Sequence, residues 1–258
     1  MYRNQLVTVV LPAFNEERLL PQTLAGLPQY VDRIIVVDDG STDDTLLITR
    51  AIKDHRLKVL PHLMNQGVGR AISTGYREAL SEDTDLIVVM GADNQMKPEE
   101  IPSLLDPIVD DESDYTKGNR LGHPDHKRLM PFVRRFGTWT LSYLTSMATG
   151  LSGIQDSQCG FTAISATTLR ALPFETLYAR YGYPNDLLSL LALRKKRVKD
   201  VIVTPIYQSE ESNLHIHRVC LPLLGILIRA LVRRLASAGR NHDNPIESPQ
   251  IRRSSHSS

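Results

Sequence analysis

The 258-residue sequence has few cysteines and no large excess of charge of either sign. Its two cysteines, Cys159 and Cys220, show no spacing typical of a metal site or a disulfide, so we expect a reducing compartment. The formal net charge is only +1 at pH 7. Bulk binding of nucleic acid needs a strongly basic surface, so we expect no nucleic-acid partner.

Long apolar runs are also absent. No uninterrupted stretch reaches the roughly 18 apolar residues of a membrane-spanning helix. The N-terminus starts with a strand-like run and lacks the basic, apolar and small-residue order of a signal peptide. Because 41% of the residues are hydrophobic, the chain can bury one substantial core. We therefore expect one soluble, cytoplasmic domain with appendages.

Short β-branched runs alternate with longer helical patterns, which predicts an α/β fold whose sheet is mostly parallel and flanked by helices. Asn15 is expected to cap the first helix and Thr42 or Asp43 the second, while a third helix follows Gly67 and ends near Leu80. The predicted strands cover residues 7–11, 34–38, 57–60, 86–90, 115–118, 160–164 and 201–206.

The last part of the chain has a different pattern. Residues 119–136 are polar and basic and are predicted to form a mobile loop, followed by an apolar helix over 137–151. Residues 214–237 form an amphipathic helix that either lies at a membrane interface or packs on the domain, and the sequence leaves both open. Residues 238–258 are rich in Ser, Arg, Asn and Pro and are predicted to be disordered. The main domain is therefore expected to span residues 1–213.

Acidic and amide side chains follow two of the predicted strands. Asp93 and Gln95 come after one apolar run, and Asp38 and Asp39 come at the end of another. Ligands gather at the carboxyl ends of strands in α/β sheets, and carboxylate oxygens suit Mg²⁺ or Mn²⁺ that bridges phosphates. Two adjacent acids repel each other unless a partner such as a base N–H or a ribose hydroxyl engages them. Both positions are therefore candidates for ligand binding.

Further motifs have a structural interpretation beside the functional one. Phe14 is placed to border a base and Glu16 to contact a nucleoside, but the pattern is also that of a plain strand–loop–helix junction. Residues 65–70 resemble a phosphate-cradling turn, although a plain tight turn explains them more simply. Asp156 precedes a turn-prone segment, and Asp186 opens an apolar helix that it could cap.

Taken together, these motifs resemble the family 2 glycosyltransferases with the GT-A fold, and more closely their polyprenyl-phosphate branch, which includes dolichol-phosphate mannosyltransferases. The resemblance covers roughly residues 6–212. It rests on Pro-Ala-Phe-Asn-Glu-Glu at 12–17, Val-Asp-Asp-Gly-Ser-Thr-Asp at 37–43 and Asn-Gln-Gly-Val-Gly at 65–69. The segment that contains Asp156, Gly160 and Phe161 matches the Asp-x-x-x-Gly-Phe motif of the branch.

The resemblance implies a UDP- or GDP-sugar donor, a Mg²⁺ or Mn²⁺ cofactor, and a polyprenyl phosphate or another lipid-linked acceptor at a membrane surface. The metal motif of the family reads Asp-x-Asp-x-Gln. Here Gly91 replaces the first Asp, so Asp93 and Gln95 are the implied metal ligands. The implied nucleotide-binding residues are Pro12, Phe14, Glu16, Asp38, Asp39 and Asp93. The residues implied to bind an acceptor phosphate are Arg120 and, from the mobile loop, Arg128, Arg134 and Arg135.

The implied reaction is an inverting transfer, in which an acceptor oxygen attacks the anomeric carbon as the nucleoside diphosphate leaves. A polyprenyl phosphate is ionised at neutral pH and needs positioning by cations such as Arg120. The hydroxyl of a lipid-linked or soluble glycan would instead need a carboxylate base, with Asp186 as the first candidate and Asp156 as the second. A non-catalytic nucleotide-sugar-binding protein is a third alternative, suggested by Gly91. For a lipid acceptor, we expect a peripheral protein on the cytoplasmic face of a membrane.

Overall fold

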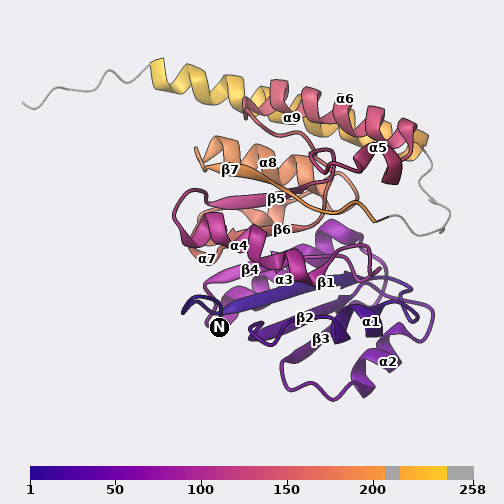
Figure 1. The fold of residues 1–258 in the computed structure, drawn as a ribbon. Helices are drawn as coiled ribbons and strands as arrows, with labels where there is room; N and C mark the ends of the chain where they lie inside the picture. The colour runs from indigo at the N-terminus through magenta and orange to yellow at the C-terminus, as the bar shows by residue number, and fades with distance from the viewer. Residues whose placement is uncertain (207–215, 243–258) are drawn as a thin grey trace, which may run out of the picture.

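The computed structural model describes residues 1–206 and 216–242 of the chain. One seven-stranded sheet of order β3-β2-β1-β4-β6-β5-β7 runs through the molecule (Figure 1). All its pairings are parallel except those of β6, which is antiparallel to both β4 and β5. The strands are β1 (Val7–Ala13), β2 (Arg33–Asp38), β3 (Leu57–Pro61), β4 (Leu86–Val89), β5 (Tyr115–Asn119), β6 (Thr162–Ser165) and β7 (Val198–Ile202).

The structure confirms the predicted α/β architecture and a strand near each predicted position. The central strand β4 is buried along its whole length, as expected for an apolar run covered on both faces. The last strand differs most from its predicted position. It begins at Val198, whereas the prediction begins at residue 201. As an edge strand, β7 exposes Lys199, and the charged residues at its centre obscure the apolar pattern on which the prediction depends.

Helices cover both faces of the sheet. Apolar side chains of α1 and α4 pack on one face, and those of α3, α7 and α8 pack on the other. Outside α8, α6 and α9 lie side by side as a further layer (Figure 1). The helices are α1 (Leu20–Ala25), α2 (Thr45–Ala51), α3 (Val68–Ser81), α4 (Ile101–Val109), α5 (His126–Leu129), α6 (Phe132–Thr149), α7 (Ala166–Arg170), α8 (Tyr183–Leu193) and α9 (Ile216–His242), with short 3₁₀ turns at Pro98–Glu100 and Phe174–Thr176.

The predicted cap of the first helix is wrong. Asn15 has a φ of 58° and lies outside α1, which begins only at Leu20. Its side-chain Oδ1 accepts the backbone N–H of Thr42 at 2.8 Å, and its own N–H donates to Ser41 Oγ at 3.0 Å. Asn15 therefore joins the loop after β1 to the loop after β2. Local sequence could not predict this contact, because its partners lie far along the chain. The N-cap of α2 is Asp44 rather than the predicted Thr42 or Asp43, and its side chain makes no capping bond. The carboxylate of Asp43 nevertheless accepts the N–H of Thr45, the first residue of α2, at 3.0 Å.

The predicted mobile loop over residues 119–136 is in part helical. It contains α5 and the first turn of α6, which begins at Phe132, directly after Pro131. A proline just before the first turn has no N–H to leave unpaired and a φ suited to a helix start. The prediction missed this because the basic residues of the segment conceal the apolar spacing of the helix.

The C-terminal helix α9 packs on the domain, which is one of the two alternatives that the sequence leaves open. Its buried side, which includes Leu223, Ile226 and Leu227, packs inward, while apolar residues on the other side stay exposed. The helix continues to His242, so residues 238–242 of the predicted disordered tail are helical, and residues 243–258 lie outside the described residues. Within the part of the chain that the structure describes, no helix is both long and apolar enough to cross a membrane.

Candidate active site

A cavity of about 430 Å³ lies where β1 and β2 end. It is named the Phe14 cavity here. Four of the predicted nucleotide-binding residues line it: Pro12, Phe14, Glu16 and Asp39. The opposite wall comes from distant segments, the loop at 178–182 and Pro222 of α9. The fold thus gathers residues from both ends of the chain around one cavity.

Asp39 shapes this cavity through contacts within the protein. It is only 3% exposed, and its Oδ1 accepts from His62 Nδ1–H at 2.7 Å and from the N–H of Gln66 at 3.0 Å. Its Oδ2 accepts the N–H of Gly67 at 2.7 Å. The turn at residues 65–67 therefore points two N–H groups at a carboxylate of the protein. This contradicts the interpretation of those N–H groups as a phosphate cradle.

The neighbouring Asp38 differs in its bonding. It is buried, and its Oδ1 has no hydrogen-bond partner among the described residues. A buried carboxylate oxygen without a donor carries a desolvation penalty that a ligand donor would remove. Of the two adjacent acids, Asp38 is therefore the one whose hydrogen bonding remains incomplete.

The strand-end motif after β4 places Asp93 and Gln95 together. Asp93 is partly buried, and its Oδ1 accepts the N–H of Gln95 at 3.1 Å. A Cβ built on Gly91 would lie 2.7 Å from that Oδ1, so any larger residue at position 91 would displace the carboxylate. Among the described residues, no cluster of three or more His, Cys, Asp or Glu side chains could hold a metal.

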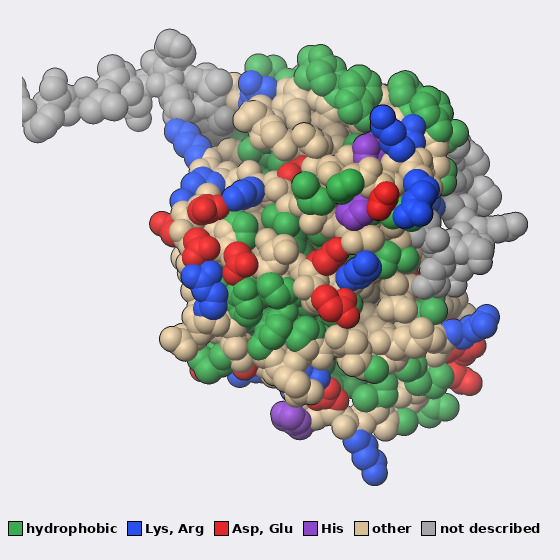
Figure 2. Space-filling view, viewed as in Figure 1, with side chains coloured by type: hydrophobic (Ala, Val, Ile, Leu, Met, Phe, Trp, Pro, Cys, Tyr) green, Lys and Arg blue, Asp and Glu red, His purple; other side chains and the backbone are tan. Residues whose placement is uncertain are grey.

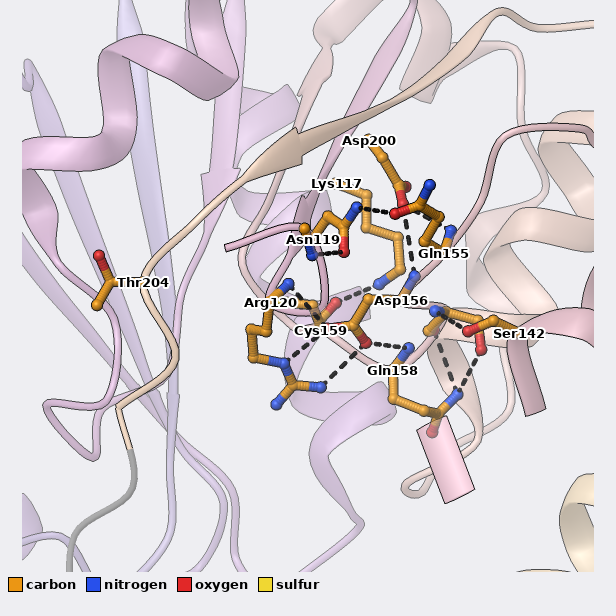
Figure 3. A network of polar contacts seen from close by, with 12 residues as sticks. Lys117, Asn119, Arg120, Ser142, Gln155, Asp156, Gln158, Cys159, Asp200 and Thr204 are labelled. Carbon is orange, nitrogen blue, oxygen red and sulfur yellow. Dashed lines mark hydrogen bonds and ion pairs between the residues drawn. The ribbon is translucent and has the colours of Figure 1, made fainter. Parts of the chain in front are cut away.

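Arg120 and Asp156 form a bidentate pair at the end of β5 (Figure 3). Arg120 Nε donates to Asp156 Oδ2 at 2.7 Å and Nη2 donates to Oδ1 at 3.0 Å. Asp156 is fully buried, whereas the Arg120 side chain keeps 24% of its surface exposed. Burial alone would raise the pKa of Asp156, but the charge of Arg120 and its hydrogen bonds hold the pKa below its usual value. Asp156 is therefore an ionised anchor for Arg120.

Two charged residues that the sequence analysis missed lie behind this pair. Lys117 is fully buried in β5, and its Nζ donates to the carbonyl oxygen of Cys159 (Figure 3). Burial lowers the pKa of Lys117 and raises the pKa of Asp200 to about 6. Asp200 Oδ2 accepts the N–H groups of Gln155 and Asp156. A lysine inside an otherwise uncharged strand was the available signal for this network.

Asp186, the first candidate for a general base, is buried and engaged in contacts within the protein. It is 1% exposed, and its carboxylate pairs with two arginines of α9, Arg229 at 2.6 Å and Arg233 at 3.1 Å. It also accepts the N–H of Tyr178 at 2.9 Å. These contacts join α8 to α9, and they are the contacts of a structural ion pair. The first candidate for a general base is therefore already fully engaged.

The three arginines of the predicted loop have different surroundings in the structure. Arg128 is exposed and pairs with Asp125 at 3.7 Å. Arg134 is exposed on α6. Arg135 donates to the carbonyl of Lys127 at 3.1 Å. Arg180, which the sequence analysis did not single out, lines the Phe14 cavity.

Comparisons with known proteins show which sequences this chain resembles. The UDP-N-acetylglucosamine–dolichyl-phosphate N-acetylglucosaminyltransferase of Methanococcus voltae is 29% identical over 219 residues, which cover 79% of this chain and 87% of that protein. The undecaprenyl-phosphate mannosyltransferase of Micrococcus luteus is 32% identical over 203 residues, covering 77% and 82% of the two chains.

The solved structures that resemble this chain confirm its fold. Glucosyl-3-phosphoglycerate synthase from Mycobacterium tuberculosis, in complex with Mn²⁺, UDP-glucose and phosphoglyceric acid, matches with a TM-score of 0.68 at 21% identity, covering 88% of this chain and 80% of that one. The fold is GT-A, as predicted. The family model described as glycosyl transferase family 2 matches residues 8–172. The chain therefore belongs to glycosyltransferase family 2.

Proposed function

We propose that this protein transfers a sugar, with inversion, from a nucleotide-sugar donor to the phosphate of a polyprenyl phosphate. The observation that carries the proposal is the Arg120–Asp156 pair, which presents a fixed, partly exposed guanidinium. The two relatives named above act, by their names, on dolichyl and undecaprenyl phosphates, and this supports the same class of acceptor.

The acceptor chemistry matches the residues at hand. A phosphate monoester, whose second pKa is near 6, reaches the site ionised, so no proton has to be removed before attack. A phosphate oxygen attacks the anomeric carbon, the bond from that carbon to the diphosphate breaks, and the electron pair leaves with the diphosphate. Arg120 would hold the attacking phosphate by charge-assisted hydrogen bonds. Both candidate bases, Asp156 and Asp186, are instead paired with arginines.

The Phe14 cavity is the proposed donor site. The exposed ring of Phe14 offers a face for the base. Asp38, a predicted nucleotide-binding residue, is buried and is not among the residues that line the cavity. Asp39 is proposed to act by holding the turn at residues 65–67 that borders the cavity. Whether the donor carries UDP or GDP depends on contacts to the base, and both fit this proposal.

Asp93 and Gln95 are the proposed ligands of Mg²⁺ or Mn²⁺. One carboxylate and one amide oxygen suit a hard cation that draws its other ligands from phosphates and water. Such an ion would neutralise the charge that develops on the leaving diphosphate. The absence of a side chain at Gly91 leaves room for the Asp93 carboxylate.

We also propose that the outer layer lies against the cytoplasmic face of a membrane. Apolar residues of α6 and α9 are exposed in large numbers, and Figure 2 shows hydrophobic side chains along the edge that these helices occupy in Figure 1. An exposed apolar surface of this extent is typical of an interaction site. The exposed residues on the two helices are Phe132, Val133, Phe136, Trp139, Tyr143, Leu144, Met147, Leu221, Leu224, Ile228, Leu231, Val232 and Leu235.

A transfer assay tests the proposal. Purified protein is incubated with UDP- and GDP-sugars, with a polyprenyl phosphate or a glycan acceptor, and the products are identified by mass spectrometry. We expect sugar transfer to the polyprenyl phosphate, reduced roughly 10²-fold or more in Arg120→Ala. Arg120→Lys keeps the charge but loses the bidentate fork and should lie between the two. Arg50→Ala, at an exposed arginine of α2, is the matched control. Transfer to the glycan hydroxyl alone would overturn the proposal.

A further inference from the structure

A second cavity, of about 530 Å³, lies along one side of α6. Its volume falls within the roughly 300–1,000 Å³ range of small-ligand sites. It is named the Trp139 cavity here. Four aromatic residues of α6 line it at spacings of four, three and four residues, which places them on one side of the helix. They are Phe132, Phe136, Trp139 and Tyr143.

The aromatic rings form a continuous row. Successive ring centroids lie 6.4, 6.3 and 6.1 Å apart from Phe132 to Tyr143. The rings are far from buried, and Trp139, for example, is 59% exposed. Aromatic side chains of this size normally contribute to a core, so an exposed row of them along a cavity indicates a surface that an apolar ligand covers.

One end of the cavity adjoins the Arg120–Asp156 pair. Leu121 and Gln155, which follow Arg120 and precede Asp156 in the chain, both line the cavity. Asn119 Nδ2 donates to Gln155 Oε1 at 2.9 Å and so fixes this end (Figure 3). His126 and Arg135 add basic groups to the lining. A ligand with an anionic head at Arg120 could therefore continue directly into the aromatic row.

We propose that the Trp139 cavity binds the isoprenoid chain of the acceptor lipid next to its phosphate. The inference rests on the proposed function, because it takes the phosphate to lie at Arg120. The flat rings offer large apolar contact area to a branched, unsaturated chain, and burial of each methylene favours binding. The rings belong to the exposed apolar surface of α6 that is proposed to lie against a membrane, so the rest of the chain can pass from them into the lipid.

The single tryptophan makes the cavity observable without turnover, since Trp139 is the only one in the chain. Full-length protein is titrated with farnesyl phosphate, geranyl phosphate, dodecyl phosphate and inorganic phosphate while the emission of Trp139 is recorded. We expect a shift to shorter wavelength with the prenyl phosphates and none with inorganic phosphate. One added isoprene unit should tighten binding about tenfold or more.

Variants localise the effect. Phe136→Ala and Tyr143→Ala should each weaken farnesyl phosphate binding about tenfold, whereas Leu235→Ala, an exposed apolar residue of α9 outside the cavity, should leave it unchanged. Unchanged Trp139 emission at farnesyl phosphate concentrations that saturate transfer would overturn the cavity assignment and leave the proposed function standing. We expect dodecyl phosphate to bind more weakly than farnesyl phosphate. Equal binding of the two would overturn the assignment of the cavity to an isoprenoid chain. Chain-dependent binding without transfer to any polyprenyl phosphate would support the cavity and refute the proposed function.

Discussion

Position 91 decides how many charges the strand-end motif offers to a cation. Gly91 leaves Asp93 as the one carboxylate between Met90 and Lys97. Asp93→Asn keeps the acceptor for the Gln95 N–H but removes the charge, so we expect transfer to fall roughly 10²–10³-fold with the fold intact. Transfer rates and circular dichroism of Asp93→Asn, compared with Glu99→Gln as an exposed control, measure this. Full activity of Asp93→Asn would refute the metal assignment.

Asp200 predicts a pH dependence of stability. Burial raises its pKa to about 6 from an ordinary 3.8, so between these values the folded state holds a proton that the unfolded state has lost. The free energy of unfolding should therefore fall as the pH rises from about 4 to about 6, by up to about 3 kcal/mol, and then level off. Asp200→Asn should remove this fall. Urea unfolding of both proteins between pH 4 and 8 measures the free energy of unfolding. The same dependence on pH in both proteins would contradict the prediction.

Sequence motifs predicted which residues share one cavity better than which contacts each residue makes. Pro12, Phe14, Glu16 and Asp39 indeed line one cavity. The partner of Asp39, His62, and the partners of Asp186 come from other elements, and no spacing in the sequence shows such long-range contacts. Acidic residues near a site look alike in a sequence, whereas burial and pairing distinguish an anchor from a base.

At the scale of elements, the pairing of α8 with α9 gives a direct test of Asp186. Asp186→Asn leaves two arginines of α9 without their buried carboxylate, so we expect the free energy of unfolding to fall by about 1–3 kcal/mol. The expected loss is smaller than for a fully buried ion pair, because the Arg229 side chain is 40% exposed. Transfer per folded molecule should fall much less than in Arg120→Ala. Chemical denaturation and transfer assays on the same samples measure both quantities.

The opposite result has a clear meaning. A loss of roughly 10²–10⁴-fold in Asp186→Asn at unchanged stability is the behaviour of a general base and would favour a hydroxyl acceptor. Asp186→Asn combined with Arg233→Gln provides a control. If the pair is structural, the double variant should lose less stability than the sum of the single variants.

Strands were easier to predict than helix ends. Apolar β-branched runs such as those of β1, β2 and β4 are buried on both faces, so composition alone identifies them. The start of α6 was missed because its first turn carries Arg134 and Arg135 beside exposed aromatic residues. A helix whose apolar side faces outward does not show the pattern expected for a helix on a soluble core.

At the scale of the molecule, the outer layer predicts membrane binding that depends little on lipid charge. Arg229 and Arg233 pair with Asp186, which reduces the charge that they offer to acidic lipid. We expect the protein to float with neutral as well as anionic liposomes. Leu224→Asp with Ile228→Asp, on the exposed side of α9, should abolish flotation. Leu47→Asp on α2, at the far end of the molecule in Figure 1, is the control. Equal flotation of the unmodified protein, the double variant and the control would contradict the prediction.

The position of α9 has a consequence for the order in which the protein matures. Pro222 of α9 forms part of the wall of the Phe14 cavity, beside Gly182. During synthesis, all seven strands leave the ribosome before α9 does. A nascent chain can therefore complete its sheet while this cavity still lacks one wall. Competence to hold a nucleotide sugar should thus appear late, when the helix that follows the last strand has docked.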